Sequence, residues 1–392
     1  MSDARSDSRV RRIGDGCLIV LFCVVLVLPT LDWVFHLDRS PTPNENRAPA
    51  PFPAWDDSSG NLQAFLSGLE AWFNDHFGFR KKLVRLHNRW LAKLFRQSSS
   101  ADVLIGRDGW LYFAGGRMID NYTGARLLTT DDLQAWQKLL ETRRGWLAKR
   151  GIGYLFVIAP NKETVYPEHL PEWLTRIGKE TKLSQFIAHM RAHSSVEVLD
   201  LRPVLMETKS TVLTYHPTDS HWNAFGAFVA CQLLVQTLGR QLPGGLDALP
   251  IDAFELRFVD QAAGDLAQTS GGALVSRERN SPELTPRPPL QPLEIQSDSS
   301  VSEGSGRPVR VPIYTERAGQ RHRIVLFRDS FATAWTPFVG QHFARAVYVQ
   351  QYHWDAALIE REHPDVVVDE AAERLVNEGD PSELFKSDNL PR

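Results

Sequence analysis

The sequence predicts an α/β fold, a doubly wound and mostly parallel sheet with flanking helices. Uninterrupted apolar runs, typical of strands buried on both faces of a sheet, lie at 154–159 and 324–327. Amphipathic segments of helical period lie between such runs, at 131–150 and 223–238. Strands that alternate with helices favour a parallel sheet, and ligands of such sheets bind beyond the carboxyl ends of the strands.

The first part of the chain is typical of an export signal or a membrane anchor. Residues 1–12 carry arginines ahead of an apolar stretch, so we expect them to stay in the cytoplasm. The purely apolar core, 17–29, is short for a spanning helix, but 13–36 reaches the necessary length. Because no small-x-small cleavage motif follows the core directly, we expect 13–36 to be an uncleaved signal anchor. Cleavage is the alternative.

Two further parts precede the α/β region. Residues 37–60 are rich in Pro, Ala, Asn and Ser and are predicted to be a linker. In the helical lead-in, 61–100, apolar residues recur at helical spacing over 62–73 and 83–95. The second of these helices carries basic residues at its other positions: Arg80, Lys81, Lys82, Arg85, Arg89, Lys93 and Arg96. They form either a solvated face or a contact with lipid headgroups or an anionic glycan.

Residues 101–392 are expected to form the main domain. It begins with a hairpin over 103–113, and the helix over 131–150 follows a capping threonine. Further strands are predicted at 196–199, 346–349 and 366–369, with helices near 178–194 and 354–362. The segment at about 268–308 is predicted to be a flexible surface insertion, since it has too few apolar residues to offset the entropy of ordering.

Composition narrows the class of function. The net charge is only −3, so the total charge does not indicate a nucleic-acid partner. The three cysteines have neither the spacing of a metal site nor the number for a disulfide framework. There is no phosphate-binding P-loop motif. We therefore expect no cofactor, no metal and no nucleic acid.

A serine, a histidine and an aspartate suggest acyl-transfer chemistry. Ser330 follows the apolar strand at 323–327, and Asp219 and His221 lie about a hundred residues upstream. A serine hydroxyl becomes nucleophilic when an imidazole takes its proton and a carboxylate fixes the imidazole tautomer. In an extended backbone, side chains two residues apart point to one side, which would pair Asp219 with His221.

Each of these short motifs also has a structural interpretation. Asp and Ser are favoured helix N-caps, so both segments could simply start helices. His216 is a rival base, but it precedes a proline and has no equally placed carboxylate in the sequence. Trp222 is either a core residue or a platform for a sugar ring.

Asp219-x-His221-Trp222 together with Arg328-Asp329-Ser330-Phe331 resembles the SGNH-type acetyltransferases that modify bacterial exopolysaccharides, and the alginate O-acetyltransferase family in particular. Further stretches agree with this family in their order along the chain: 45–47, 73–80, 106–112, 160–167 and 364–374. The resemblance covers roughly 45–265 and 322–376. It implies an SGNH-hydrolase-like fold in which Asp-x-His precedes the serine.

The resemblance also implies an activity and partners. By position, Ser330 would be the nucleophile that carries an acetyl group, His221 the general base and Asp219 its orienting carboxylate. The acceptor would be an exopolysaccharide hydroxyl, and a multi-spanning membrane acyltransferase would supply acetyl groups from the cytoplasm. The catalytic domain would then lie in the periplasm, held at the inner membrane by the N-terminal anchor.

Two rivals and one departure from the family pattern stay open. An acetyl esterase would use the same three residues, and a non-catalytic glycan-binding subunit of a polysaccharide secretion complex would not use them. Arg328 stands where a glycine usually precedes Asp-Ser, so the first oxyanion-hole block is not standard. The Ser330 amide is still expected to be one oxyanion donor, and the second donor is not identified. Asn161, which follows the strand at 154–159, is one candidate. For Arg328 itself, two roles stay open: it contacts the substrate, or it holds the turn through Asp329.

Overall fold

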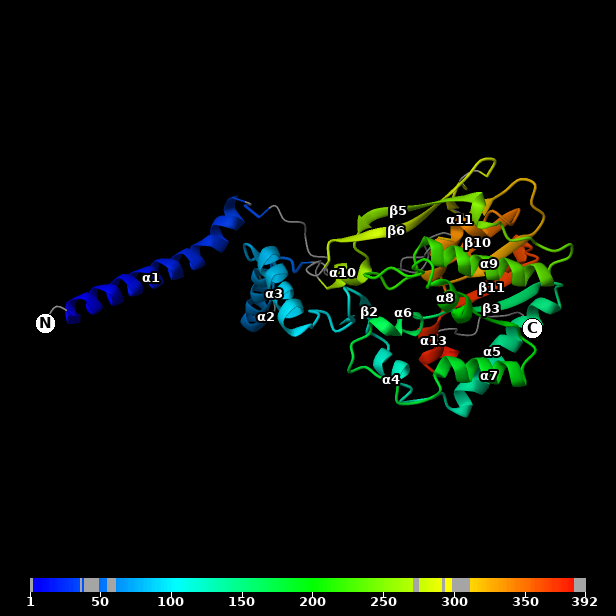
Figure 1. Cartoon of the computed structure of the whole chain (residues 1–392), viewed down its shortest axis with the longest axis horizontal. Helices are drawn as coiled ribbons and strands as arrows, with labels where there is room; N and C mark the ends of the chain where they lie inside the picture. The colour runs from blue at the N-terminus through cyan, green and yellow to red at the C-terminus, as the bar shows by residue number, and fades with distance from the viewer. Residues whose placement is uncertain are drawn as a thin grey trace. The chain divides into compact units, whose positions relative to one another are not determined.

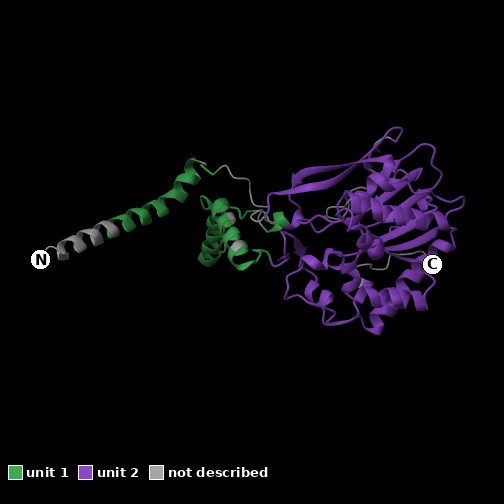
Figure 2. Ribbon diagram, in the orientation of Figure 1, with its two compact units in different colours: residues 1–100, 267–274 green, residues 101–266, 275–392 purple. Residues whose placement is uncertain are grey.

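The computed structural model describes residues 3–35, 37–38, 49–54, 61–270, 275–290, 293–297 and 311–383. Most of the predicted linker, 39–48 and 55–60, therefore lies outside the described residues. The chain forms two compact units (Figure 2). The first comprises residues 1–100 and 267–274, and the second comprises 101–266 and 275–392.

The first unit consists of helices among its described residues. They are α1 (Asp3–Phe35), α2 (Leu62–His76) and α3 (Arg80–Phe95). In α1, the window Asp15–Asp32 is long and apolar enough to cross a membrane, as judged by length and composition. The side chain of Asn61 caps α2 by accepting a hydrogen bond from the Ala64 amide at 3.1 Å. The two helices predicted at 62–73 and 83–95 are thus confirmed as α2 and α3.

The second unit is built on a sheet whose strand order is β4-β3-β11-β9-β10-β8-β7 within the described residues. Figure 1 labels three of these strands, β3, β10 and β11. The bounds are β3 Gly153–Ala159, β4 Val198–Asp200, β7 Gln296–Ser297, β8 Ile313–Glu316, β9 Arg323–Phe327, β10 Arg345–Val349 and β11 Val366–Ala372. Neighbours from β4 to β10 are parallel, and β8 pairs antiparallel with β10 and with β7. This confirms the predicted mostly parallel sheet and adds an antiparallel edge.

Helices cover both faces of this sheet. The bounds are α4 Met118–Thr123, α5 Thr130–Ala148, α6 Lys162–Val165, α7 Lys182–His193, α8 Arg202–Thr208, α9 Ala224–Gln241, α10 Asp265–Thr269, α11 Thr336–Val339, α12 Ala356–Glu362 and α13 Glu373–Asn377. Short 3₁₀ helices are η1 Pro167–His169, η2 Ile251–Ala253, η3 Phe331–Trp335 and η4 Pro381–Glu383. Helices α5, α7 and α12 share one apolar cluster, and α8, α9 and α11 share the other.

The central strand β9 shows why its sequence is continuously apolar. Ile324 and Leu326 pack into the cluster with α9, whereas Val325 and Phe327 pack into the cluster with α5. Because successive side chains of a strand point to opposite faces, a strand covered on both faces needs an apolar residue at every position. The strands predicted at 154–159, 346–349 and 366–369 are likewise confirmed as β3, β10 and β11.

Two antiparallel hairpins complete the unit. The first, β1 (Val103–Ile105) with β2 (Leu111–Phe113), was predicted. The second pairs β5 (Phe254–Ala262) with β6 (Arg277–Pro286) and was not predicted. The expectation of a flexible insertion at 268–308 is wrong for 277–286, where polar residues form a strand because β5 supplies backbone hydrogen bonds. Residues 271–274, 291–292 and 298–308 of that segment lie outside the described residues.

Candidate active site

Ser330 lies just beyond the carboxyl end of β9, where ligands of parallel sheets bind. Arg328 and Asp329 lead from the strand to Ser330, which precedes the 3₁₀ helix η3. The buried Asp329 carboxylate accepts hydrogen bonds from the Phe331 amide at 2.8 Å and the Ala372 amide at 2.9 Å. It therefore ties the turn that carries the serine to the end of β11, next to β9 in the sheet.

A second buried carboxylate supports the same turn. Glu370 accepts a hydrogen bond from the Asp329 amide at 3.0 Å. Burial, followed by the neighbouring charge of Asp329, raises the pKa of Glu370 well above its ordinary value. A protonated Glu370 avoids placing two like charges side by side beneath the serine.

Asp219 and His221 lie on the loop between α8 and α9, and a local hydrogen bond pairs them. One Asp219 oxygen, Oδ1, accepts from the His221 amide at 3.0 Å and lies 2.7 Å from His221 Nδ1. The loop is bent at these residues rather than extended, so the expected pairing has a different cause from the one predicted. An aspartate that binds the amide two residues later forms an Asx turn, and this turn brings the imidazole back over the carboxylate.

The loop and the strand end bring the three residues together. His221 Nε2 lies 2.7 Å from Ser330 Oγ, so serine, imidazole and carboxylate form one hydrogen-bonded chain. With Asp219 facing Nδ1, the neutral imidazole carries its proton on Nδ1 and presents Nε2 to the hydroxyl as an acceptor. Ser330 and His221 are both half-buried, which leaves the site accessible.

The environment keeps Asp219 ionised. Burial acts to raise the pKa of Asp219, but the hydrogen bonds from His221 and from the Asp265 amide outweigh it and hold the pKa below its usual range. The Asp265 amide lies 2.9 Å from Asp219 Oδ2. The carboxylate is therefore a fixed negative charge beside the imidazole.

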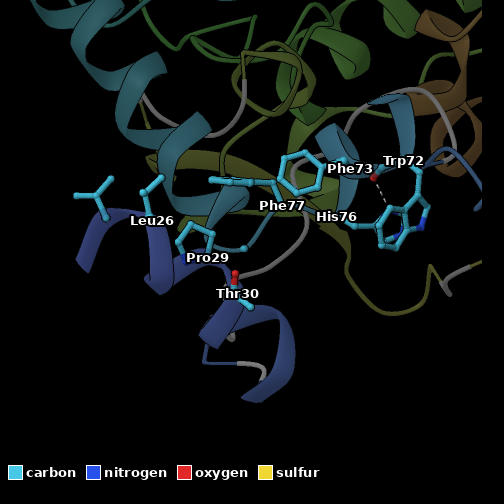
Figure 3. A pocket seen from close by; sticks show the side chains of 9 residues that line it. Leu26, Pro29, Thr30, Trp72, Phe73, His76 and Phe77 are labelled. Atoms are coloured by element: carbon cyan, nitrogen blue, oxygen red, sulfur yellow. Dashed lines mark hydrogen bonds between the residues drawn. The ribbon is translucent and has the colours of Figure 1, made fainter. Parts of the chain in front are cut away.

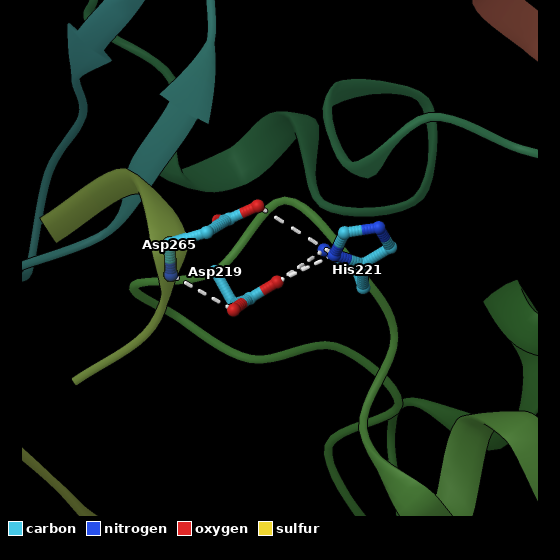
Figure 4. A group of neighbouring side chains, drawn as sticks. All are labelled: Asp219, His221 and Asp265. Carbon is cyan, nitrogen blue, oxygen red and sulfur yellow. Dashed lines mark hydrogen bonds and ion pairs between the residues drawn. The ribbon is translucent and has the colours of Figure 1, made fainter. Parts of the chain in front are cut away.

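Asp265 is a second carboxylate at this site that the sequence analysis missed (Figure 4). Its Oδ2 lies 3.6 Å from His221 Nδ1 and accepts the Ser220 hydroxyl at 2.6 Å, while its Oδ1 accepts the Ser220 amide at 2.7 Å. Ligand atoms of Asp219, His221 and Asp265 lie within 4.8 Å of one another. Their hydrogen bonds to each other and to Ser220 account for this closeness, and we assign no metal to them.

Close packing at Gly264 holds Asp219 in place. A Cβ atom at residue 264 would lie 2.3 Å from Asp219 Cβ and 2.6 Å from its Cα. Gly264→Ala should therefore displace the Asp219 carboxylate from His221. We expect the turnover rate to fall by about 10²-fold, the scale of a misplacement near 1 Å in an active site.

The measurement is kcat with an activated acetyl ester, and Gly145→Ala is the matched control. Gly145 lies in α5, and a Cβ atom there would have no neighbouring atom within 4 Å. This variant should keep full activity and gain roughly 0.5–1 kcal/mol of stability, because alanine loses less backbone entropy than glycine inside a helix. Equal activity of the two variants would show that Gly264 does not position Asp219.

The rival base His216 has a different partner. Its Nδ1 lies 2.7 Å from Oε2 of Glu278, on strand β6. The expectation that His216 lacks a carboxylate is therefore wrong, because Glu278 comes from the segment predicted as a flexible insertion. Glu278 also accepts the Thr218 amide at 2.7 Å, so the His216–Glu278 pair braces the loop next to Asp219.

Trp222 is a core residue and is not placed to stack on a sugar. It is 2% exposed and packs against Trp335 with ring centroids 5.5 Å apart. Its indole N–H donates to the Phe331 carbonyl at 3.0 Å. Trp222 thus joins the loop that carries Asp219 and His221, called the histidine loop below, to the segment that follows Ser330. Its burial rules out the platform for a sugar ring and confirms the core alternative.

Arg328 is buried behind the serine. Its guanidinium donates to the Asp329 carbonyl at 2.9 Å and to the Thr333 hydroxyl at 2.6 Å. Of the two roles left open for it, these contacts favour holding the turn over contacting substrate. Arg328 therefore supports the turn in place of the glycine of the usual pattern.

Asn161 and Lys162 follow the carboxyl end of β3, and Lys162 contacts the histidine loop. Lys162 is buried, and its ammonium donates to the carbonyls of Asp219 at 2.6 Å and of His216 and Pro217 at 3.1 Å. Burial lowers the pKa of Lys162 to about 7, against the opposing charges of nearby carboxylates. The sequence signal for Lys162 was present, since it closely follows a buried strand.

Asn161 is half-buried and lines a small pocket together with Ser220, Glu163 and Arg374. Its side-chain amide donates to Glu163 Oε1 at 2.9 Å, and its backbone amide donates to Glu373 Oε2 at 2.9 Å. The Arg374 guanidinium lies 5.5 Å from the ring centroid of Phe331, the residue after Ser330. Asn161 therefore faces the same edge of the sheet as the serine.

The sheet and the Ser–His–Asp arrangement define an SGNH-like α/β protein. A family model described as "SGNH hydrolase-like domain, acetyltransferase AlgX" matches residues 103–304, just over half of the chain. The chain belongs to this family, which confirms the resemblance to the alginate O-acetyltransferases.

Several known proteins are similar to the chain. A probable alginate O-acetylase AlgJ of Pseudomonas putida is 30% identical over 201 residues, 48% of this chain and 50% of the relative. Its counterpart from Pseudomonas fluorescens is 28% identical over 178 residues, 45% of this chain and 42% of the relative. The chain thus spans about half the length of the curated relatives that it matches. The solved O-acetyltransferase domain of Pseudomonas putida AlgJ superimposes with a TM-score of 0.45 and 20% identity, over 70% of this chain and 92% of that one.

Proposed function

We propose that this protein is a periplasmic O-acetyltransferase that moves acetyl groups to hydroxyls of an exopolysaccharide. The observation that carries the proposal is the hydrogen-bonded chain Asp219–His221–Ser330 at the carboxyl edge of the sheet. Membership of an acetyltransferase family and the names of the relatives support the transfer of acetyl groups.

In the first step, His221 Nε2 takes the proton of Ser330 Oγ as Oγ attacks the carbonyl carbon of an acetyl donor. The resulting imidazolium is stabilised by Asp219 and gives its proton to the leaving group, whose bond to the carbonyl carbon breaks. The acetyl group is then an ester on Ser330. In the second step, a glycan hydroxyl gives its proton to Nε2 and attacks this ester, and Ser330 Oγ leaves with the proton.

Both steps pass through a tetrahedral oxyanion that needs hydrogen-bond donors. We assign the Ser330 amide as one donor and the Asn161 side chain as the second. A primary amide has two N–H groups, and that of Asn161 donates to Glu163 Oε1, which leaves its other N–H for the oxyanion.

The proposal also assigns each segment of the chain to a compartment or a role. Residues 1–12 lie in the cytoplasm, 13–36 form an uncleaved anchor in the inner membrane, and 37–60 and 61–100 form the linker and the helical lead-in. Residues 101–392 form the catalytic domain. The acceptor is the exopolysaccharide, and a multi-spanning membrane acyltransferase supplies the acetyl groups.

The experiment that tests the function measures where the acetyl group goes. The full chain would receive an activated acetyl ester and a panel of oligosaccharides that includes alginate oligomers. We expect acetyl esters on an oligosaccharide to increase with its concentration while the release of free acetate falls. Release of acetate alone, unaffected by every oligosaccharide, would show that water is the acceptor and that the protein is an esterase.

A further inference from the structure

Helix α3 exposes a stripe of large apolar side chains. Its members recur at helical spacing and are each between 51% and 62% exposed: Leu83, Leu86, Trp90 and Leu94. An apolar stripe on a helix normally packs against the protein core. Apolar side chains this exposed indicate a surface that meets something other than water.

Helix α2 has a similar stripe. Leu62, Leu66 and Phe73 are between 47% and 57% exposed, and no described residue of α2 is buried. The antiparallel partners of a stable helical hairpin usually bury such residues between them. Residues 77–79 join the two helices, and we call the segment 62–95 the α2–α3 hairpin. Apolar side chains of both of its helices are exposed.

The charge of α3 indicates which kind of partner this apolar surface would contact. Helix α3 contains six Lys and Arg residues and no acidic residue. Lys82, Arg89 and Arg96 are exposed beside the apolar stripe. A helix with an apolar stripe, several basic residues and no acidic residue is typical of segments that lie in the interface of an anionic bilayer.

One hydrogen bond and one close backbone contact fix the beginning of α3 at the end of the candidate membrane span. The Phe79 amide donates to Asp32 Oδ2 at 2.7 Å, and Asp32 is the last residue of the span. Gly78 packs so closely on Pro29 that a Cβ atom there would lie 2.0 Å from the Pro29 carbonyl oxygen. The basic helix therefore begins at the depth where a span that ends at Asp32 leaves the hydrocarbon.

The same junction contains an apolar groove of about 410 Å³ (Figure 3). Leu26 and Pro29 of α1 form one side of it, and Trp72, Phe73 and Phe77 form the other. Because one wall belongs to the candidate span, the groove opens at acyl-chain depth. Lipid tails are the occupant that matches its position and its apolar lining.

We propose that the α2–α3 hairpin is a second membrane contact that lies in the bilayer interface, with its apolar stripes among acyl chains and its basic side chains at anionic headgroups. This inference rests on the proposed N-terminal anchor, because the span sets the depth of the hairpin. The consequence is that two elements, a span and an interfacial hairpin, attach the chain to the membrane.

The test places one environment-sensitive fluorophore on the full chain in vesicles. Cys17, Cys23 and Cys231 would first be replaced by serine, and the label would be attached to Leu86→Cys. Vesicles would contain phosphatidylglycerol and phosphatidylcholine, with or without bromine on the acyl chains. We expect a blue-shifted emission and strong bromine quenching, since interfacial helices bury their apolar face about 5–10 Å into the boundary of headgroups and acyl chains.

The matched control is the same label on Ile177→Cys, since Ile177 is 80% exposed in the α/β unit. We expect quenching at residue 86 to exceed that at residue 177 several-fold. If the protein floats with the vesicles but bromine quenches the labels at residues 86 and 177 equally, the proposal is overturned. The flotation would still support the anchor. A blue shift without bromine quenching would show that protein covers the stripe and would also overturn it. A chain that fails to float overturns the anchor and, with it, this inference.

Discussion

Ser330→Ala is expected to lower kcat with an activated acetyl ester by about 10⁶-fold. The variant removes the only oxygen that the structure places 2.7 Å from His221 Nε2 in the described part of the chain, so no acetyl-enzyme forms. Binding and the oxyanion donors remain, but they do not replace the nucleophile. The measurement is the initial rate of acetate release or acetyl transfer under saturating ester.

Ser220→Ala is the matched control, because this second serine also contacts the imidazole. Its hydroxyl lies 3.2 Å from His221 Nδ1 and donates its hydrogen bond to Asp265. It does not face Nε2, the nitrogen that would take the proton of the nucleophile. We expect it to keep the acetyl-enzyme and most of the rate. If Ser220→Ala were as inactive as Ser330→Ala, the assignment of the nucleophile would need revision.

Asp219→Asn should lower kcat by about 10⁴-fold while leaving the fold intact. An amide in this place donates to Nδ1, which moves the imidazole proton to Nε2 and leaves the serine without a base. Asp219 has a pKa below its usual range, so the stability that its ionised form adds is present above the ordinary pKa of an aspartate. This stability is lost as the pH falls through the lower pKa that Asp219 has in the folded protein.

Asp265→Asn separates the roles of the two carboxylates. Its oxygen lies 3.6 Å from His221 Nδ1, beyond hydrogen-bond length, so this variant should cost much less than Asp219→Asn. Steady-state kinetics of both variants, with circular dichroism to verify the fold, make the comparison. A larger loss from Asp265→Asn would make Asp265 the orienting carboxylate.

The α/β fold could be predicted because its sheet has two covered faces. Strand β9 is apolar at Ile324, Val325, Leu326 and Phe327, and such a run is visible in a single sequence. Strand β6 could not be predicted in the same way. Its register with β5 depends on backbone hydrogen bonds between polar segments, and no periodicity of apolar residues marks it.

Candidate-site residues that are close in sequence or follow a strand end could be proposed, whereas those brought in by tertiary packing could not. Ser330, His221 and Asp219 belong to recognisable motifs, and the structure brings them within hydrogen-bond distance. Asp265 and Glu278 reach the histidine loop from α10 and from β6, and nothing local connects them to it. Burial, which assigns Trp222 to the core, is likewise a property of the fold.

The most direct test of the central claim is peptide mass spectrometry of the full chain after exposure to an activated acetyl ester. The account predicts one acetyl group on the peptide that contains Ser330, absent from Ser330→Ala and removed when an acceptor oligosaccharide is added. An acetyl group that persists in Ser330→Ala, or that resides on another residue while turnover continues, would contradict an acyl-enzyme on Ser330.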